Sequence, residues 1–181
     1  MNKIVQICSV GSALMISSTV MAAGPNTITF QGEVTSQTCE VTVNGNASNP
    51  VVLLPTVSTT VLTAAGSTAG ETTFKLGVTG CDGTATNSNT KFVGNLVDAD
   101  GNLGNATGTG YATNVALQLL TSSGGTAINL NDETSSTVPG VVLADGETEG
   151  SVEYAVQYYS NVGAATAGSV IGSVQYAVVY E

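Results

Sequence analysis

The C-terminal stretch of the chain, residues 170–181, reads VIGSVQYAVVYE and points to the fold class. Its even-numbered positions are apolar, aromatic or glycine, whereas its odd-numbered positions mix polar and apolar side chains. The even set is Val170, Gly172, Val174, Tyr176, Val178 and Tyr180. Because successive side chains of a strand point to opposite faces, this period of two predicts a β-strand with one buried face and with Gln175 on the other face.

The same alternation recurs upstream, and helical periodicity is weak throughout. The clearest runs are Ile28–Val34, Phe74–Val78, Val115–Leu119 and Val152–Tyr158. At most one helical turn is expected, near residues 62–66. Several short strands separated by turns predict an all-β sandwich or barrel, and a length of 181 residues fits one domain.

Four segments between these runs predict loops or turns. Residues 83–90 and 103–113 contain few apolar side chains, so we expect loops there. Residues 98–102 (Asp-Ala-Asp-Gly-Asn) form a turn-rich sequence. The pair Gly124-Gly125 is a hairpin signal between Leu119 and the apolar residues that follow.

The N-terminus has the features of an export signal. Lys3 supplies a positive charge, residues 4–16 are mostly apolar, and Val20-Met21-Ala22 fits a cleavage site before Ala23 or before Gly24. We therefore expect residues 1–22 to be a signal peptide; a buried N-terminal helix is the alternative. No other hydrophobic run approaches 18 residues, so no membrane span is expected in the mature chain.

The expected export explains the cysteines. Cys8 would leave with the signal peptide, and Cys39 and Cys81 would remain as one pair in an oxidising compartment. A pair of metal-binding or redox thiolates is the alternative, but the chain has neither a C-x-x-C motif nor a histidine. We expect a disulfide, which in the chain-entropy model stabilises the fold by roughly 4 kcal/mol.

The composition excludes several functions. The chain has 13 acidic residues, 3 lysines, no histidine and a net charge of −10. Nucleic acid is not an expected partner, because phosphate contacts need a basic surface. Serine–histidine and cysteine–histidine catalysis and imidazole zinc sites need histidine. We therefore expect no enzyme and no cofactor.

Few motifs indicate a chemical site. Residues 98–102 resemble part of a calcium loop, but the glycine stands at position 4 rather than 6 and position 12 is Thr109, so we interpret them as an acidic turn. The acidic residues 145–153 surround a glycine-containing turn and are interpreted as solvated rather than catalytic. Two glycosylation sequons begin at Asn46 and Asn105, and they decide nothing because the motif is short. No catalytic or metal-binding residue is predicted.

Several of these features together resemble a known family. A signal peptide precedes an alternating stretch with a central glycine, residues 28–34, and Cys39 follows five residues later. Cys81 lies about forty residues further on, Gly168 stands near the C-terminus, and the alternating tail ends at a penultimate tyrosine, Tyr180. Over its mature length the chain resembles the pilins of the chaperone–usher pathway, the family of type 1, P and type 3 fimbriae.

The resemblance implies an incomplete immunoglobulin-like sandwich that lacks its last strand. The gap would be a hydrophobic groove, which donor-strand complementation fills with a strand of another protein. Residues 23–35 would be the donor extension and residues 36–181 the pilin domain. The implied donor residues are Asn26, Ile28, Phe30, Gly32 and Val34. The alternative is that residues 27–35 are the first strand of a self-contained sandwich.

At the other end of the chain, the resemblance implies an acceptor strand at about residues 169–180, which would also bind the chaperone. Its implied residues are Gly168, Val170, Gly172, Val174, Tyr176, Val178 and Tyr180. A periplasmic chaperone would occupy the groove first, with its basic residues near Tyr180 and the terminal carboxylate. At the outer-membrane usher, the extension of the next pilin subunit would replace the chaperone strand.

The implied function is a structural subunit of a cell-surface fimbrium that supports adhesion and is exported through the periplasm. The alternative is a single-domain fimbrial adhesin whose loops, residues 83–90 and 98–113, recognise a host glycan or protein. The sequence leaves open whether the chain is a major rod subunit or a minor one.

Overall fold

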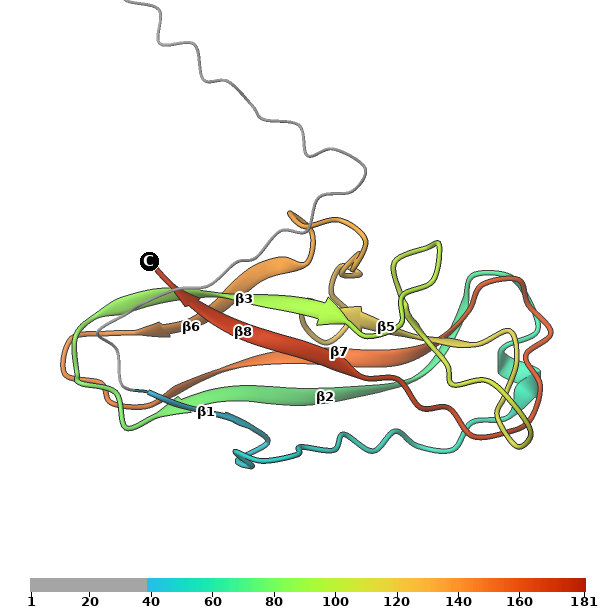
Figure 1. The fold of residues 1–181 in the computed structure, drawn as a ribbon, viewed down its shortest axis with the longest axis horizontal. Helices are drawn as coiled ribbons and strands as arrows, with labels where there is room; N and C mark the ends of the chain where they lie inside the picture. The colour runs from blue at the N-terminus through green and yellow to red at the C-terminus, as the bar shows by residue number, and fades with distance from the viewer. Residues whose placement is uncertain (1–38) are drawn as a thin grey trace, which may run out of the picture. The chain divides into compact units, whose positions relative to one another are not determined.

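Residues 39–181, which the computed structural model describes, form two antiparallel sheets that face each other (Figure 1). The first sheet has the order β1 (Glu40–Val43), β2 (Ser67–Thr79), β7 (Gly150–Ser160), β5 (Ala116–Leu120) and β4 (Leu103–Gly104). The second has the order β6 (Thr137–Leu143), β3 (Thr86–Gly94) and β8 (Val174–Tyr180). This arrangement confirms the all-β sandwich.

Helix is almost absent from the described part of the chain. One short 3-10 helix, η1 (Thr59–Val61), precedes the position where a helical turn was expected, and Ser58 caps it by accepting a hydrogen bond from the backbone of Thr60. Between residues 39 and 181 no helix is long and apolar enough to cross a membrane.

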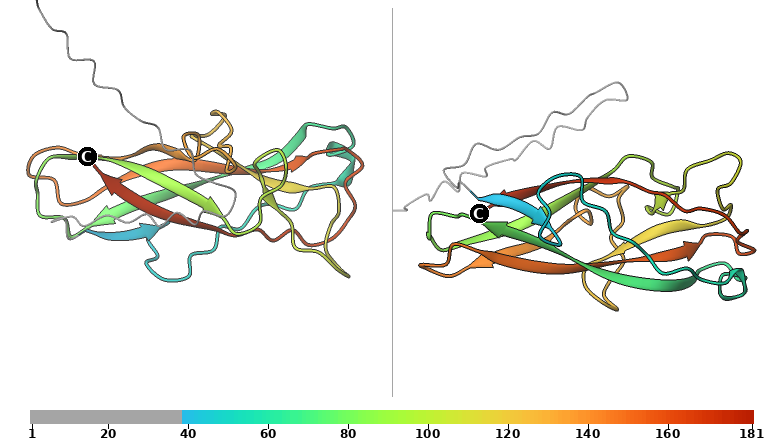
Figure 2. Two further views of the ribbon diagram at one scale, coloured as in Figure 1. Left: turned by 45° about the horizontal axis from the view of Figure 1, so that its top comes forward. Right: turned by 90° about the horizontal axis from the view of Figure 1, so that it is seen from below.

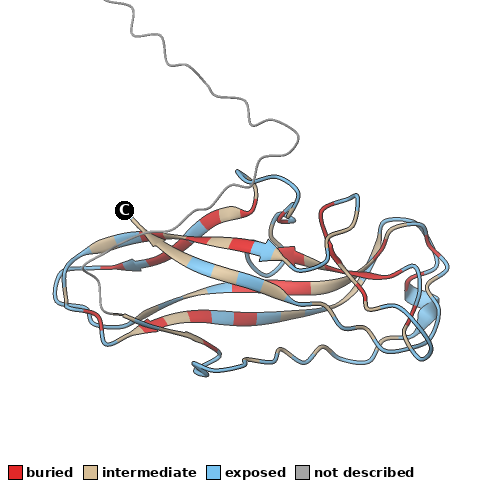
Figure 3. Ribbon diagram, viewed as in Figure 1, coloured by how far each residue is buried: buried red, intermediate tan, exposed pale blue. Residues whose placement is uncertain are grey.

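The core lies between the two sheets and follows the alternation of the sequence. On β2, Phe74, Leu76 and Val78 are buried, and the residues between them are exposed or half-buried (Figure 3). The remaining strands contribute the same kind of side chain, chiefly Phe92, Leu117, Leu119, Val138, Val141, Leu143 and Val156. The period of two thus predicts the buried face of β2, β5 and β7 correctly.

Tyr154 joins the two sheets at the centre of the core. Its ring comes from β7 and lies 5.2 Å, centroid to centroid, from the ring of Phe92 on β3 in an edge-to-face arrangement. Its hydroxyl donates a 2.8 Å hydrogen bond to the carbonyl oxygen of Pro139 on β6. Burial raises the pKa of the Tyr154 phenol, and an interaction with the Thr90 hydroxyl offsets part of that rise. The phenol is therefore held in its neutral form.

The loop expected at residues 83–90 is wrong over most of its length, because residues 86–94 form β3, the central strand of the second sheet. Its inward residues include Ser88 and Thr90, which are polar yet buried. The Ser88 hydroxyl is satisfied by donating to the carbonyl oxygen of Val141. Low apolar content therefore hid a strand whose core face carries hydroxyl side chains.

The other loop and turn predictions hold in part. Residues 121–126 close a tight turn after β5 through a hydrogen bond from the Thr121 amide to the Thr126 carbonyl, but only an isolated bridge follows it and no second strand. Of residues 103–113, the first two form β4 and the rest is irregular.

The disulfide between Cys39 and Cys81 is confirmed. It joins the residue before β1 to the residue after Gly80, in the turn that follows β2. The bond therefore fixes the start of the described chain to one end of the sandwich.

The strand expected at about residues 169–180 begins only at Val174. Gly168, Val170 and Gly172 precede it, in a lead-in segment that bonds to the loop of residues 105–112. A side chain at Gly168 would collide with the backbone of Ala112 at 2.4 Å and with that of Tyr111 at 2.5 Å. The lead-in therefore lies beside the first sheet before the chain crosses to the second.

Asn105 is the side chain that holds this lead-in. Its amide nitrogen donates to the carbonyl oxygens of Ala112 and Ser169, and its carbonyl oxygen accepts from the backbone N–H of Ile171. Asn105 is 9% exposed. Asn105 is thus a buried side chain that joins the lead-in to the loop of residues 105–112.

Tyr154 predicts an alkaline loss of stability. Above about pH 10 the phenol ionises in the unfolded chain, whereas the raised pKa keeps it neutral in the fold. The free energy of unfolding should therefore fall as the pH rises from about 10 through the folded pKa. For Tyr154→Phe, the free energy of unfolding should fall less steeply above about pH 10. At neutral pH it should be about 1 kcal/mol lower than that of the unmodified protein, because the hydrogen bond is lost. Urea unfolding at a series of pH values measures both; equal slopes for the two proteins would contradict the role of Tyr154.

Asn105 predicts a large loss of stability on truncation. Asn105→Ala leaves two carbonyl groups and one N–H without their side-chain partner, so it should cost about 3 kcal/mol. Asn46→Ala is the matched control: Asn46 begins the other sequon, but it is exposed and its side chain makes only a 3.5 Å contact, so its truncation should cost less than about 0.5 kcal/mol. Urea unfolding compares the two variants, and equal losses of the free energy of unfolding would contradict the proposed role of the Asn105 side chain.

Candidate assembly surface

The strand β8 is an edge strand. It pairs with β3 along one side, from Ser88 opposite Tyr180 to Gly94 opposite Val174. On its other side no strand within residues 39–181 pairs with it. An edge of this kind presents backbone N–H and C=O groups that can pair with a further strand.

The inward face of β8 is only half covered. Of its even-numbered side chains, the first three pack against the core yet stay half-buried, and the last is half-buried too, whereas Gln175 and Ala177 are exposed. The even set in the strand is Val174, Tyr176, Val178 and Tyr180. In the lead-in, Gly172 faces the same way, because a side chain there would meet Leu103 and Leu117 of the core at 3.2 Å. Residues with the apolar character of a core therefore lack the cover that the central strands have.

A second row of half-buried apolar side chains lies on the segment after β1. Residues 50–57 form no strand, yet they alternate: Val52, Leu54 and Val57 are half-buried, and Val51 and Leu53 are 74% and 82% exposed. Seen from below in Figure 2, this segment crosses the side of the sandwich between β8 and β2. Sequence reasoning did not assign it to the site, although the continuous apolar run of residues 51–54 was the available signal. We call the apolar side formed by β8 and this segment the open flank.

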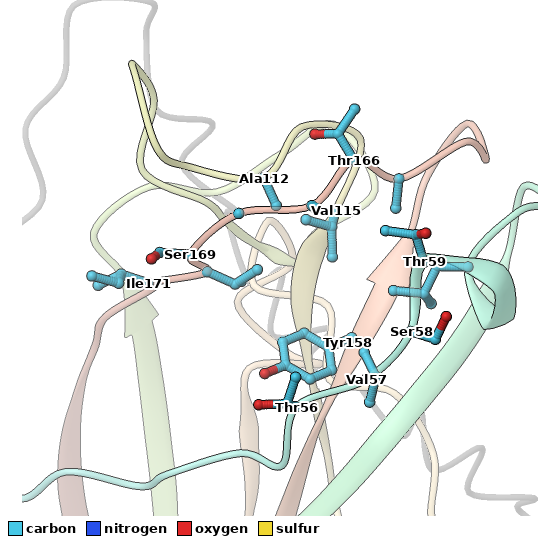
Figure 4. Close-up of a pocket in the computed structure, with 15 residues that line it drawn as sticks. Thr56, Val57, Ser58, Thr59, Ala112, Val115, Tyr158, Thr166, Ser169 and Ile171 are labelled. Atoms are coloured by element: carbon cyan, nitrogen blue, oxygen red, sulfur yellow. The ribbon is translucent and has the colours of Figure 1, made fainter.

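A cavity of about 680 Å³ lies at the start of β8 (Figure 4). Residues 56–59 line one side of it and residues 165–171 line the other. Leu62, Val115 and Tyr158 add apolar surface, and hydroxyl side chains such as Thr59 and Thr166 line its margin. The cavity continues the apolar character of the open flank to its end.

The described acidic side chains do not form a catalytic or metal centre. No group of three or more histidine, cysteine, aspartate or glutamate side chains with metal-binding geometry occurs in residues 39–181. The Asp98 carboxylate accepts hydrogen bonds from the amides of Asp100 and Asn102 and from the side chain of Asn161. Glu147 accepts from the amide of Ala144 and closes its own turn. These carboxylates therefore stabilise turns.

The residues that the sequence assigned to strand exchange fall into two groups. The acceptor residues in β8 and its lead-in lie together along the open flank and beside the cavity. The donor residues Asn26, Ile28, Phe30, Gly32 and Val34 lie outside the described residues. Of the two loops assigned to a possible adhesin site, residues 98–113 remain mostly irregular, whereas most of residues 83–90 belongs to β3.

Comparison with known proteins assigns the chain to a family. Residues 28–181 match the family described as fimbrial protein. The F17 fimbrial protein of Escherichia coli is 36% identical over 188 residues that span all of both chains. The major fimbrial subunit SMF-1 of Stenotrophomonas maltophilia is 38% identical over 87% of this chain and 94% of its own length.

A solved structure supports the fold. The P pilus rod subunit PapA superposes with a TM-score of 0.52 at 19% identity, covering 86% of this chain and all of that one. Such a likeness shows the immunoglobulin-like fold of the pilins. The relatives are structural proteins rather than enzymes. The chain belongs to the fimbrial protein family and is a fimbrial subunit of the chaperone–usher type.

Proposed function

We propose that this chain is a structural fimbrial subunit that polymerises by donor-strand complementation and supports adhesion. The observation that carries the proposal is the open flank: within residues 39–181, β8 pairs with a strand on one side only, and its apolar face is half covered. A strand laid beside β8 would pair with the backbone along this edge and cover the apolar face in one step.

The extension has the pattern that this flank requires. Ile28, Phe30 and Val34 share one parity, so one face of an extended strand would carry all three. Residues 28–34 in extended form reach about 20 Å, which equals the reach of the seven residues of β8. Burial of each large side chain contributes roughly 1.5–3 kcal/mol, and each strand hydrogen bond about 1 kcal/mol net. A complemented subunit would therefore be very stable.

The same flank accounts for the two other partners. Before assembly, a periplasmic chaperone would cover the flank with one of its own strands, with basic residues near Tyr180 and Glu181. The outer-membrane usher would then exchange that strand for the extension of the next subunit. On this proposal, residues 1–22 are the signal peptide, residues 23–35 the donor extension and residues 36–181 the pilin domain, and the subunit passes through the periplasm to the cell-surface fimbrium.

Removal of residues 24–35 should separate the two partner interactions. The shortened chain keeps β8 and the open flank, so it should still form a complex with the co-expressed chaperone at a yield within about twofold of the full chain. It should not extend a fibre, because it has no strand to donate. Pull-down of the periplasmic complex and electron microscopy of the cells measure the two steps. Normal fimbriae built from the shortened chain would disprove the donor assignment.

Substitution by aspartate at neighbouring positions of β8 tests the acceptor face. Val174→Asp puts an unpaired charge on the apolar side of the strand, which is strongly unfavourable, so the yield of chaperone complex and the number of fimbriae should fall at least tenfold. Gln175→Asp is the matched control: its side chain is exposed on the opposite face, and we expect less than a twofold change. An equal loss for both variants, or a larger loss for Gln175→Asp, would mean that the assigned face is wrong.

A further inference from the structure

The two ends of the sandwich differ sharply in charge. One end, which we call the acidic pole, consists of residues 39–40, the loops 80–85 and 144–149, and the C-terminal residues 180–181 (Figure 1). Hydrogen bonds from Gly146 to Gly83 and from Cys81 to Thr148 join its two loops. Its acidic side chains are all exposed: Glu40, Asp82, Asp145, Glu147, Glu149 and Glu181. The acidic pole contains no lysine, and the nearest one along β2, Lys75, is in register with Glu153.

The opposite end, which we call the uncharged pole, consists of residues 56–66, 105–115 and 161–172, and none of them carries a charge. Hydrogen bonds join the three segments, among them the one from the Ala164 amide to Thr63 and the one from the Thr166 amide to Thr113. The cavity opens here, and Val162 is 70% exposed on the same surface.

The nearest carboxylates to the uncharged pole are bound within the subunit. Asn161 donates 2.7 Å and 3.1 Å hydrogen bonds to Asp98 and Asp100. Asp98 also accepts from the backbone of its own turn. The loops that form the pole itself therefore offer hydroxyl groups, backbone groups and apolar side chains, and no charged side chain.

We propose that the uncharged pole docks the acidic pole of a second copy of the chain, so that the charge distribution sets the direction of assembly. The inference rests on the donor strand of the proposed function. Residues 35–38 connect Val34 to Cys39, a connection that spans at most about 18 Å. When residues 28–34 of one copy lie in the flank of another, the acidic pole of the donor copy must therefore lie close to one end of that flank.

The two directions of insertion differ in electrostatic cost. With the donor strand antiparallel to β8, Val34 lies at the cavity, and six carboxylates meet a surface without charge that offers hydroxyl donors. With the strand parallel to β8, Val34 lies near Tyr180, and two acidic poles meet. Like charges brought together at an interface repel and suppress that arrangement. The charge distribution thus favours a head-to-tail chain.

An added charge at the uncharged pole tests this. Chaperone-capped subunits with Val162→Glu serve as acceptors, either for a synthetic peptide of residues 24–35 or for a full-length donor subunit. At low ionic strength, exchange with the full-length donor should slow about tenfold, while exchange with the peptide, which lacks an acidic pole, should stay within about twofold. Val162→Lys should slow neither reaction, although it removes the same apolar side chain.

Three further controls decide the result. Val142→Glu adds the same charge at a 67% exposed valine on β6, outside the uncharged pole and the open flank, and should leave both rates unchanged. About 1 M salt, where the screening length is about 3 Å, should remove the defect of Val162→Glu. A donor that carries Asp145→Asn, Glu147→Gln and Glu149→Gln should restore the rate of exchange with the Val162→Glu acceptor. The pole contact would be overturned if exchange with Val162→Glu stayed slow at about 1 M salt, or if Val162→Glu and Val162→Lys slowed exchange with the full-length donor equally. Failure of the peptide to react with the unmodified subunit would overturn the donor strand itself.

Discussion

The edge of β8 beside which no strand of residues 39–181 lies is the constraint on which the rest of the structure depends. A strand that pairs on one side only, and whose inward side chains are half covered, is both unstable alone and open to unwanted pairing. The other long strands lie inside their sheets or have buried inward faces, and the edge strand β4 is only two residues long. The fold therefore concentrates its unsatisfied strand contacts in one place, where one added strand can meet them.

The surrounding structure keeps this edge in position. Tyr154 ties the two sheets together through its contacts with Phe92 and Pro139. Asn105 holds the lead-in of β8 against the first sheet, and this contact places the cavity at the start of the strand. The disulfide of Cys39 fixes the point from which the N-terminal extension leaves the domain. Rigid support of this kind lowers the entropy cost of accepting a strand.

Much of the fold was predictable from the sequence, because β-strands that are buried on one face have a period of two. The alternation identified β2, β7 and β8 and their inward faces. It failed at β3, because Ser88 and Thr90 face the core with hydroxyl groups that apolar patterning does not register. It also placed the start of β8 too early, since the alternation at Val170 and Gly172 continues through a segment that bonds to a loop instead of a strand. That exchange of partners depends on Asn105, more than sixty residues away, and no local pattern shows it.

The site was predictable in part. The alternation of apolar side chains at even-numbered positions, together with the family resemblance, identified β8, which is one side of the open flank. The other side, residues 50–57, is irregular and was missed because Pro50 and Pro55 limit its continuous apolar run to the four residues 51–54. The charge difference between the two ends was also hidden, because residues such as Asp82 and Glu147 are distant in the sequence and meet only through the hydrogen bonds between their loops.

The central claim is that the extension of one subunit completes the sandwich of the next. A cryo-electron-microscopy map of the fimbria tests it most directly. The account predicts continuous density for residues 28–34 of one subunit between β8 and residues 50–57 of its neighbour, with Ile28, Phe30 and Val34 facing the core. Density that instead places residues 28–34 in the sandwich of their own subunit, with nothing added beside β8 from the neighbour, would contradict the account.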